Sequence, residues 1–199
     1  LEEGGVIEGP DKTHRWFIDP LDGTINFMHG VPHFAVSVGL EREGHLVAGV
    51  IYNPVTDEMY TAEKGQGAWL NDRRLRVSAR RDLADSLVAT GIPHRGRPNQ
   101  NEFIHELNTV MRDVSGVRRF GSAALDLAWV ASGRYDAFWE RGLASWDMAA
   151  GIVLVREAGG LVSDLTSGQD MLTNGHVLAS NGQLHGSLLK LLKGAPSAS

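Results

Sequence analysis

Residues 16–27 read Trp16-Phe17-Ile18-Asp19-Pro20-Leu21-Asp22-Gly23-Thr24-Ile25-Asn26-Phe27, and this stretch decides the fold and the chemistry of the 199-residue chain. Its apolar start predicts a strand that ends at Asp19-Pro20, because proline cannot continue a hydrogen-bonded ladder. Two carboxylates, Asp19 and Asp22, then stand three residues apart across a proline-containing turn. Such a turn can direct both carboxylates, and the Leu21 carbonyl between them, at one point.

This arrangement suits a hard cation beside an anion. Oxygen donors without sulfur or imidazole favour magnesium, manganese or calcium. Gly23-Thr24 predicts the start of a short helix, whose free amides attract anions such as phosphate. A cation site next to an anion site is what metal-assisted phosphoryl hydrolysis requires. The alternative is an ordinary surface turn, since Asp, Pro and Gly dominate turns.

The first part of the chain, residues 1–81, is expected to form an antiparallel, meandering sheet that holds the metal site. Alternating apolar residues on either side of Glu43-Gly44-His45 predict a hairpin. Lys64-Gly65-Gln66-Gly67 predicts a second hairpin turn, since it lacks the remaining residues of a phosphate loop. The expected strands cover residues 16–18, 33–42, 46–52, 58–61, 68–70 and 75–77.

From residue 82 to residue 199 the apolar period alternates between strand and helix spacing, which predicts an α/β half packed beside the first sheet. Gly159-Gly160 is the expected stop signal of one helix. The expected helices cover residues 101–112, 122–132, 147–158 and 183–193. The expected strands cover residues 86–92, 117–120, 135–139, 161–163 and 176–180.

Composition excludes several classes of protein. Asp and Glu number 24 against 19 Lys and Arg, and the net charge of −5 argues against binding to nucleic-acid backbones. The absence of cysteine excludes disulfides, thiolate metal sites and cysteine nucleophiles. No apolar run approaches the roughly 20 residues of a membrane span. Because Leu1-Glu2-Glu3-Gly4-Gly5 is not a signal peptide, we expect a cytoplasmic protein.

The segment from Asp19 to Phe27 resembles the first signature of the inositol monophosphatase family, which are magnesium-dependent, lithium-sensitive phosphatases. Trp146-Asp147-Met148-Ala149-Ala150-Gly151 followed by Glu157-Ala158-Gly159-Gly160 is similar to the second signature. Gly121-Ser122-Ala123-Ala124 and Glu140 match further positions, so the resemblance covers essentially the whole chain. It implies a layered α+β or α/β sandwich of the αβαβα type, as in fructose-1,6-bisphosphatase, with the amino-terminal helical layer missing.

The resemblance also implies a set of ligands for two to three Mg²⁺ ions, namely Glu2, Asp19, the Leu21 carbonyl, Asp22 and Asp147. Asp19 would bridge two metals, and Thr24 would orient the attacking water. The mechanism implied is direct hydrolysis, in which two metals about 4 Å apart stabilise the attacking and leaving oxygens. No phosphoenzyme is expected, because there is no cysteine and the aspartates are occupied by cations.

The same resemblance assigns the substrate contacts. The phosphate would be held by the Gly23 and Thr24 amides close to Asp22 and Asp147. The alcohol would face Gly121, Ser122, Ala123 and Glu140. The alternatives are that Glu140 is a solvated acid at a strand end and that Asp147 is a helix N-cap, a role compatible with metal binding.

We therefore expect a phosphomonoesterase that acts on inositol monophosphates and related small polyol phosphates. Other superfamily activities are alternatives, on fructose-1,6-bisphosphate, histidinol phosphate or phosphoadenosine phosphate. Two further classes stay open: a glycosidase that uses Asp19 and Asp22, and a non-catalytic regulatory or RNA-binding protein on this fold.

Two expectations concern the whole molecule. A homodimer is expected, for which Trp129, Trp139 and Trp146 could supply apolar anchors. If the amino-terminal helices are disordered or clipped, the first sheet should expose a large apolar face, and metal occupancy should be poor.

Overall fold

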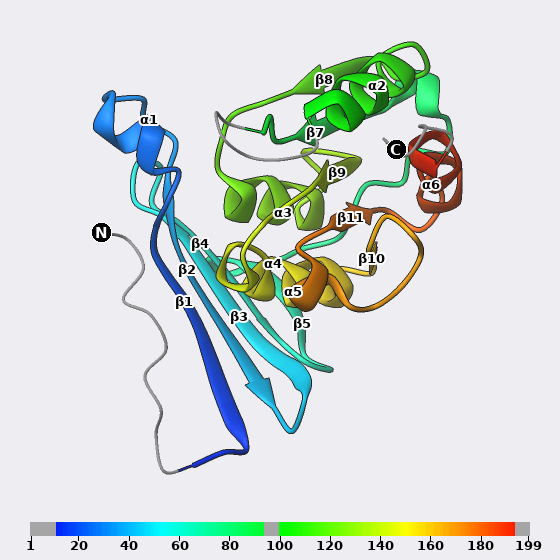
Figure 1. Cartoon of the computed structure of the whole chain (residues 1–199). Coiled ribbons are helices and arrows are strands. Elements are labelled where there is room, and N and C mark those ends of the chain that lie inside the picture. Colours follow the sequence, from blue (N-terminus) through cyan, green and yellow to red (C-terminus); the bar gives the residue numbers. More distant parts are fainter. Residues whose placement is uncertain (1–10, 94–99, 194–199) are drawn as a thin grey trace.

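The computed structural model describes residues 11–93 and 100–193, which form two β-sheets with helices between and outside them (Figure 1). The first sheet has six strands in the order β1 to β6, and every neighbouring pair is antiparallel. Its strands are β1 (His14–Asp22), β2 (Ala35–Arg42), β3 (His45–Asn53), β4 (Glu58–Glu63), β5 (Gly67–Leu70) and β6 (Arg73–Arg74). The predicted meander is confirmed.

The second sheet has five strands in the order β10-β11-β9-β7-β8. Strand β7 pairs in parallel with β8 and β9, whereas β11 pairs antiparallel with β9 and β10. The strands are β7 (Leu87–Thr90), β8 (Gly116–Arg118), β9 (Ala137–Glu140), β10 (Leu161–Ser163) and β11 (Val177–Ser180). All five were expected from the alternation of strand and helix patterns.

The helices separate into an inner and an outer layer (Figure 1). Helices α3 and α4 pack between the two sheets in the main hydrophobic core, and α2 and α6 cover the far face of the second sheet over a smaller core. The helical elements are α1 (Thr24–Met28), η1 (Leu83–Asp85), α2 (Gln100–Val110), α3 (Ala123–Ala131), α4 (Ser145–Glu157), α5 (Met171–Asn174) and α6 (His185–Lys193). The expected layered α/β sandwich is therefore present in the described residues.

Two glycines let α4 lie unusually close to the first sheet. Gly39 and Gly49 face each other across β2 and β3. A Cβ atom on Gly39 would lie 2.8 Å from the Ala149 Cβ, and one on Gly49 would lie 2.5 Å from the Ala150 carbonyl oxygen. This contact holds the first turn of α4, which carries Asp147, against the end of the sheet.

Two strand predictions differ from the structure. Residues 75–77 are not a strand, because the Val77 amide donates to the Ala158 carbonyl at the end of α4, and Leu75 is buried in the core. Strand β1 continues through Pro20 instead of ending there. It can do so because β1 is an edge strand, where proline removes no required ladder bond.

The face of the first sheet that points away from α4 exposes large apolar side chains. Along the strands they alternate with buried residues, and they are Trp16, Ile18, Val36, Val50, Met59 and Trp69. An exposed apolar face on the first sheet was one of the expectations from the sequence. In the described part of the chain, no helix has the length and apolar character needed to cross a membrane.

Candidate active site

Three aspartates from two distant segments meet at one end of the first sheet. Asp19 and Asp22 lie at the end of β1, and Asp147 lies in the first turn of α4. One carboxylate oxygen of each lies within 4.8 Å of those of the other two, so the group could hold a metal ion. Asp19 and Asp22 are buried and Asp147 is half-buried. Like charges this close and this shielded from water favour a bound cation.

A bulge between Asp19 and Asp22 puts these two residues on the same face of the sheet. In a regular strand, residues three apart point to opposite faces. Here Asp19 pairs with Ser37 and Asp22 with Ala35, so three steps on β1 match two on β2. Ser37 and Ala35 are both buried under α4. The extra residue therefore turns Asp22 inward beside Asp19, where the Leu21 amide also donates to Asp19 Oδ1 over 2.9 Å.

The start of α3 holds the Asp22 carboxylate. The Ser122 hydroxyl donates to Asp22 Oδ2, and the Ala124 amide donates to the same oxygen over 2.9 Å. Burial raises the pKa of Asp22 to about 7, and the nearby charges of Asp147 and Asp19 act in the same direction. The hydrogen bonds from α3 act against this shift. A divalent cation at the cluster would keep the carboxylate ionised.

Asp147 occupies a different helix position from the predicted one. The residue that precedes α4 is Ala144, so Asp147 is in the first turn and the N-cap interpretation is wrong. Its Oδ2 accepts a hydrogen bond from the Ala144 amide over 2.7 Å, which fixes the side chain near the helix start. This position stabilises negative charge through the helix dipole.

The Gly23-Thr24 step begins α1, as predicted. Gly23 has a positive φ of 89°, and a Cβ there would lie 3.0 Å from the His33 carbonyl oxygen. The Thr24 hydroxyl donates to the Leu21 carbonyl over 2.9 Å. That carbonyl oxygen retains a second lone pair, so Leu21 can still serve as a candidate ligand.

Asn26 was missed by the sequence analysis, although it lies within the quoted stretch. Its side-chain amide donates to the His33 carbonyl and to the Phe120 carbonyl, both over 2.8 Å. It thereby ties α1 to the Gly121–Ala123 segment, whose Ser122 contacts Asp22. Its partner Phe120 is 94 residues away in the sequence, so no local pattern signals the contact.

Glu140 lies at the end of β9 and is half-buried, so it is not the solvated acid considered above. Its carboxylate fills the space beside Gly91: a Cβ on Gly91 would lie 1.9 Å from the carboxyl carbon of Glu140. Glu140 also interacts electrostatically with Asp126, a residue that was not predicted from the sequence. Burial, followed by the charges of Glu140 and Asp22, raises the pKa of Asp126 well above its usual range.

Asp126 had a detectable signal, since it is the one acid in the apolar run of α3. It is 1% exposed, and its Oδ1 has no hydrogen-bond partner among the described residues. Asp126 is therefore a further buried carboxyl group close to Glu140 and Asp22, and burial favours its neutral form. Of the predicted site residues, Glu2 lies outside the described part of the chain.

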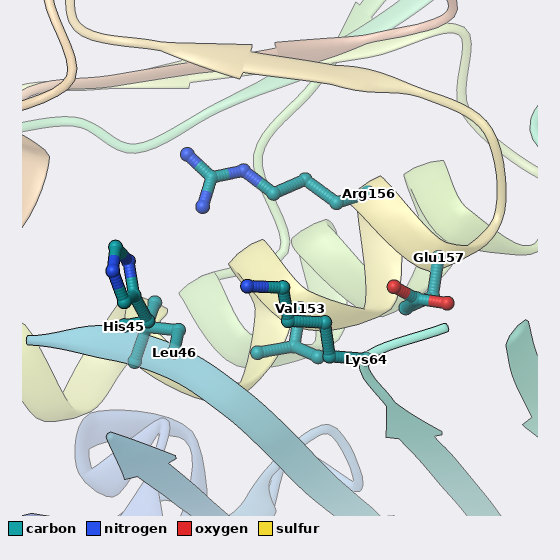
Figure 2. A pocket seen from close by; sticks show the side chains of 6 residues that line it. All are labelled: His45, Leu46, Lys64, Val153, Arg156 and Glu157. Carbon is teal, nitrogen blue, oxygen red and sulfur yellow. The ribbon is translucent and has the colours of Figure 1, made fainter. Parts of the chain in front are cut away.

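A separate pocket lies at the opposite, carboxyl-terminal end of α4 (Figure 2). Its lining includes three basic side chains and lacks the aspartates; the residues are His45, Leu46, Lys64, Val153, Arg156 and Glu157. The Glu157 carboxylate accepts the Gly65 and Gly67 amides, each over 2.9 Å, which confirms the predicted turn. The Glu157 bonds stabilise the loop between β4 and β5. The pocket is separate from the aspartate cluster.

Comparison with known proteins shows the same similarity along the whole chain. The model of the inositol monophosphatase family matches residues 1–197. An inositol-1-monophosphatase of Mesorhizobium japonicum is 60% identical over 198 residues, which cover 100% of this chain and 74% of that protein. The Nus factor SuhB of Pseudomonas aeruginosa is 50% identical over 196 residues, which cover 96% of this chain and 72% of that protein.

A solved structure gives the same result for the fold. The crystal structure of the extragenic suppressor protein suhB from Bartonella henselae superposes with a TM-score of 0.93 at 55% identity. The superposition covers 96% of this chain and 75% of that one.

Proposed function

The chain belongs to the inositol monophosphatase family, and from this membership we propose that it is a metal-dependent phosphomonoesterase. Its substrates would be inositol monophosphates and related small polyol phosphates. The observation that carries the proposal is the convergence of Asp19, Asp22 and Asp147 from β1 and α4.

The residues at the cluster fit a hard divalent cation. They offer only oxygen donors, and Asp22 is a buried carboxyl whose pKa is raised by burial and by the charges of Asp147 and Asp19. We propose Mg²⁺, two to three ions per site, held by Glu2, Asp19, the Leu21 carbonyl, Asp22 and Asp147. Bound cations would make a water more acidic and neutralise the charge of the phosphoryl group.

The chain's own residues would then orient the reactants. The Thr24 hydroxyl, which already bonds to the Leu21 carbonyl, would orient the attacking water. The Gly23 and Thr24 amides would bind the phosphate beside Asp22 and Asp147. Ser122 and the Ala124 amide hold Asp22 in place, so the α3 start supports the cluster directly.

The alcohol part of the substrate would contact Gly121, Ser122, Ala123 and Glu140. The segment Gly121–Ala123 is short and uncharged, and Glu140 supplies one acceptor for hydroxyl groups. This combination favours a neutral polyol over a charged or nucleotide leaving group. The relative from Mesorhizobium japonicum, named inositol-1-monophosphatase, supports the same class.

A screen of phosphate esters with magnesium tests the proposal. The highest kcat/KM is expected for inositol monophosphates, and excess EDTA should abolish turnover. Lithium, similar in size to magnesium but with half its charge, should inhibit. Activity on a glycoside that survives EDTA would instead support the two-carboxylate glycosidase, with Asp19 and Asp22 as its acids.

A non-catalytic protein on this fold is the second candidate, because a relative at 50% identity is named Nus factor SuhB. The two candidates differ in a measurable way. A protein that binds magnesium at the cluster and releases phosphate is the proposed enzyme, whereas one that binds no magnesium and turns over no ester is the second candidate.

A further inference from the structure

Glu106 is a buried carboxylate with no place in the chemistry above. It lies on α2 and is 0% exposed. Its Oε1 accepts the Arg141 Nε over 2.8 Å and also a second nitrogen of that guanidinium. Its Oε2 accepts the Trp139 indole N–H over 3.3 Å. Both of its partners are direct sequence neighbours of Glu140.

The positions of Trp139 and Arg141 explain why their bonds to Glu106 can affect Glu140. Trp139 and Arg141 both donate to Glu106 on α2, and successive side chains on a strand point to opposite faces. Glu140 points to the other face, where its carboxylate occupies the space left by the missing side chain of Gly91. Gly91 follows β7, whose Thr90 pairs with Trp139. Glu106 thus binds the two sequence neighbours of Glu140 on one side of β9, while the Glu140 carboxylate lies on the other side.

A short segment connects Arg141 to α4, which carries Asp147 of the aspartate cluster. The Leu143 amide donates to the Gly175 carbonyl over 2.9 Å, and α4 with Asp147 begins two residues later. The Arg141 contact is therefore the first fixed point after Glu140 on the way to Asp147. If this contact shifted, Glu140, which is proposed to face the alcohol, would move before Asp147 does.

A buried ion pair is an expensive way to add stability, because two charges must lose their water. Two nitrogens of the planar Arg141 guanidinium donate to Glu106 Oε1 and the Trp139 indole donates to Oε2, and these bonds fix the direction of the side chains. We propose that Glu106 and Arg141 are positioning residues for Glu140 and so set the preference of the enzyme for polyol phosphates. This inference rests on the proposed function, in which Glu140 faces the alcohol.

The test compares two substrates in variants that remove the charges, and Glu106→Gln also keeps the side-chain volume. The double variant Glu106→Gln/Arg141→Gln leaves no unpaired buried charge. The readout is the ratio of kcat/KM for inositol 1-phosphate to that for phenyl phosphate, whose alcohol has no further hydroxyl groups. We expect this ratio to fall about tenfold, mainly through KM for the inositol ester, which corresponds to one misplaced hydrogen bond. Turnover of phenyl phosphate should stay within about twofold.

Two comparisons separate positioning from general stability. Glu58→Gln removes a carboxylate–arginine pair of the first sheet, between Glu58 on β4 and Arg134, and it should leave the ratio unchanged. In a Glu140→Ala background, the Glu106→Gln/Arg141→Gln change should have no further effect on the ratio. If the double variant does not fold, Arg141→Lys serves instead, because it keeps the charge but loses the planar fork.

The outcomes are distinct. An unchanged ratio in a folded, active double variant would overturn the positioning role and leave the proposed function intact. A further fall of the ratio in the Glu140→Ala background would also overturn it, since the effect would then bypass Glu140. Failure of the unmodified protein to hydrolyse either ester would refute the proposed function itself.

Discussion

Asp22 links the ionisation of the site to the stability of the chain. Burial, together with the charges of Asp147 and Asp19, raises its pKa from 3.8 to about 7. Between these two values the folded protein binds more protons at this group than the unfolded chain does. The metal-free protein therefore loses stability from Asp22 as the pH rises through this window, and this contribution is greatest below the unfolded pKa.

The first prediction follows from this sign. Magnesium replaces the lost proton, so its stabilising effect on the melting temperature should be larger near pH 8 than near pH 6. Differential scanning fluorimetry with and without magnesium at both values measures the difference. Asp22→Asn should remove most of it. An equal magnesium effect at both values would show that Asp22 does not bind the cation in competition with a proton.

The second prediction concerns Asp147. Asp147→Asn retains the size of the side chain and can still accept the Ala144 amide, so the fold should persist. The loss of one charged oxygen should weaken magnesium binding by at least about tenfold, with a matching shift in the magnesium dependence of the rate. The exposed Asp113→Asn is the matched control and should behave as the unmodified protein does. Wild-type rates for Asp147→Asn at low magnesium would contradict the assignment.

At the level of single residues, the aspartates could be predicted because they lie in contiguous motifs. The bulge that brings Asp22 to the face of Asp19 could not, since it depends on the pairing of β1 with β2. The roles of Asn26 and Glu106 could not be predicted for a similar reason, because their hydrogen-bond partners lie in segments far away in the sequence.

Among the elements, the contact between α4 and the first sheet determines where Asp147 lies. A third prediction is that Gly49→Ala destabilises the protein by about 2 kcal/mol, because its Cβ would overlap the backbone of Ala150. For a chain of this size that lowers the melting temperature by roughly 4–8 °C. Because α4 must move, magnesium affinity should fall as well.

Gly186→Ala is the control for this change. Gly186 lies in α6, and a Cβ there would meet nothing within 4 Å. Alanine should stabilise that helix slightly, by up to about 1 kcal/mol, and leave magnesium affinity unchanged. A Gly49→Ala protein as stable as the unmodified one would show that α4 is not held by this close contact.

The elements with strong local signals were predicted correctly, and those set by tertiary contacts were not. The hairpin of β2 and β3 follows from alternation around Glu43-Gly44. Residues 75–77 also alternate, yet they leave the sheet because the end of α4 supplies their backbone partner. The short α5 has too few residues to show a helical period.

At the scale of the whole molecule, the main core joins both parts of the chain. It contains Ile51 and Tyr60 from the first sheet as well as residues of α3, α4 and the second sheet. The aspartate cluster lies where β1 meets α4, so it takes residues from both sides of position 81. The division into halves 1–81 and 82–199 stays a prediction.

A homodimer is the fourth prediction. Of the three tryptophans considered as anchors, Trp139 is 1% exposed in the core and is not available, whereas Trp129 and Trp146 are half-buried. Light scattering at micromolar concentration should give about twice the 21.6 kDa of one chain. A value equal to one chain would end the proposal.

The central claim is that the cluster of Asp19, Asp22 and Asp147 binds the cation that the phosphatase reaction requires. The most direct measurement is a magnesium titration of one sample of the metal-free protein, followed both by calorimetry and by the initial rate of phosphate release from inositol 1-phosphate. The account predicts no release without metal and a rate that rises over the same concentration range as binding. Phosphate release at full rate in the metal-free protein would contradict it.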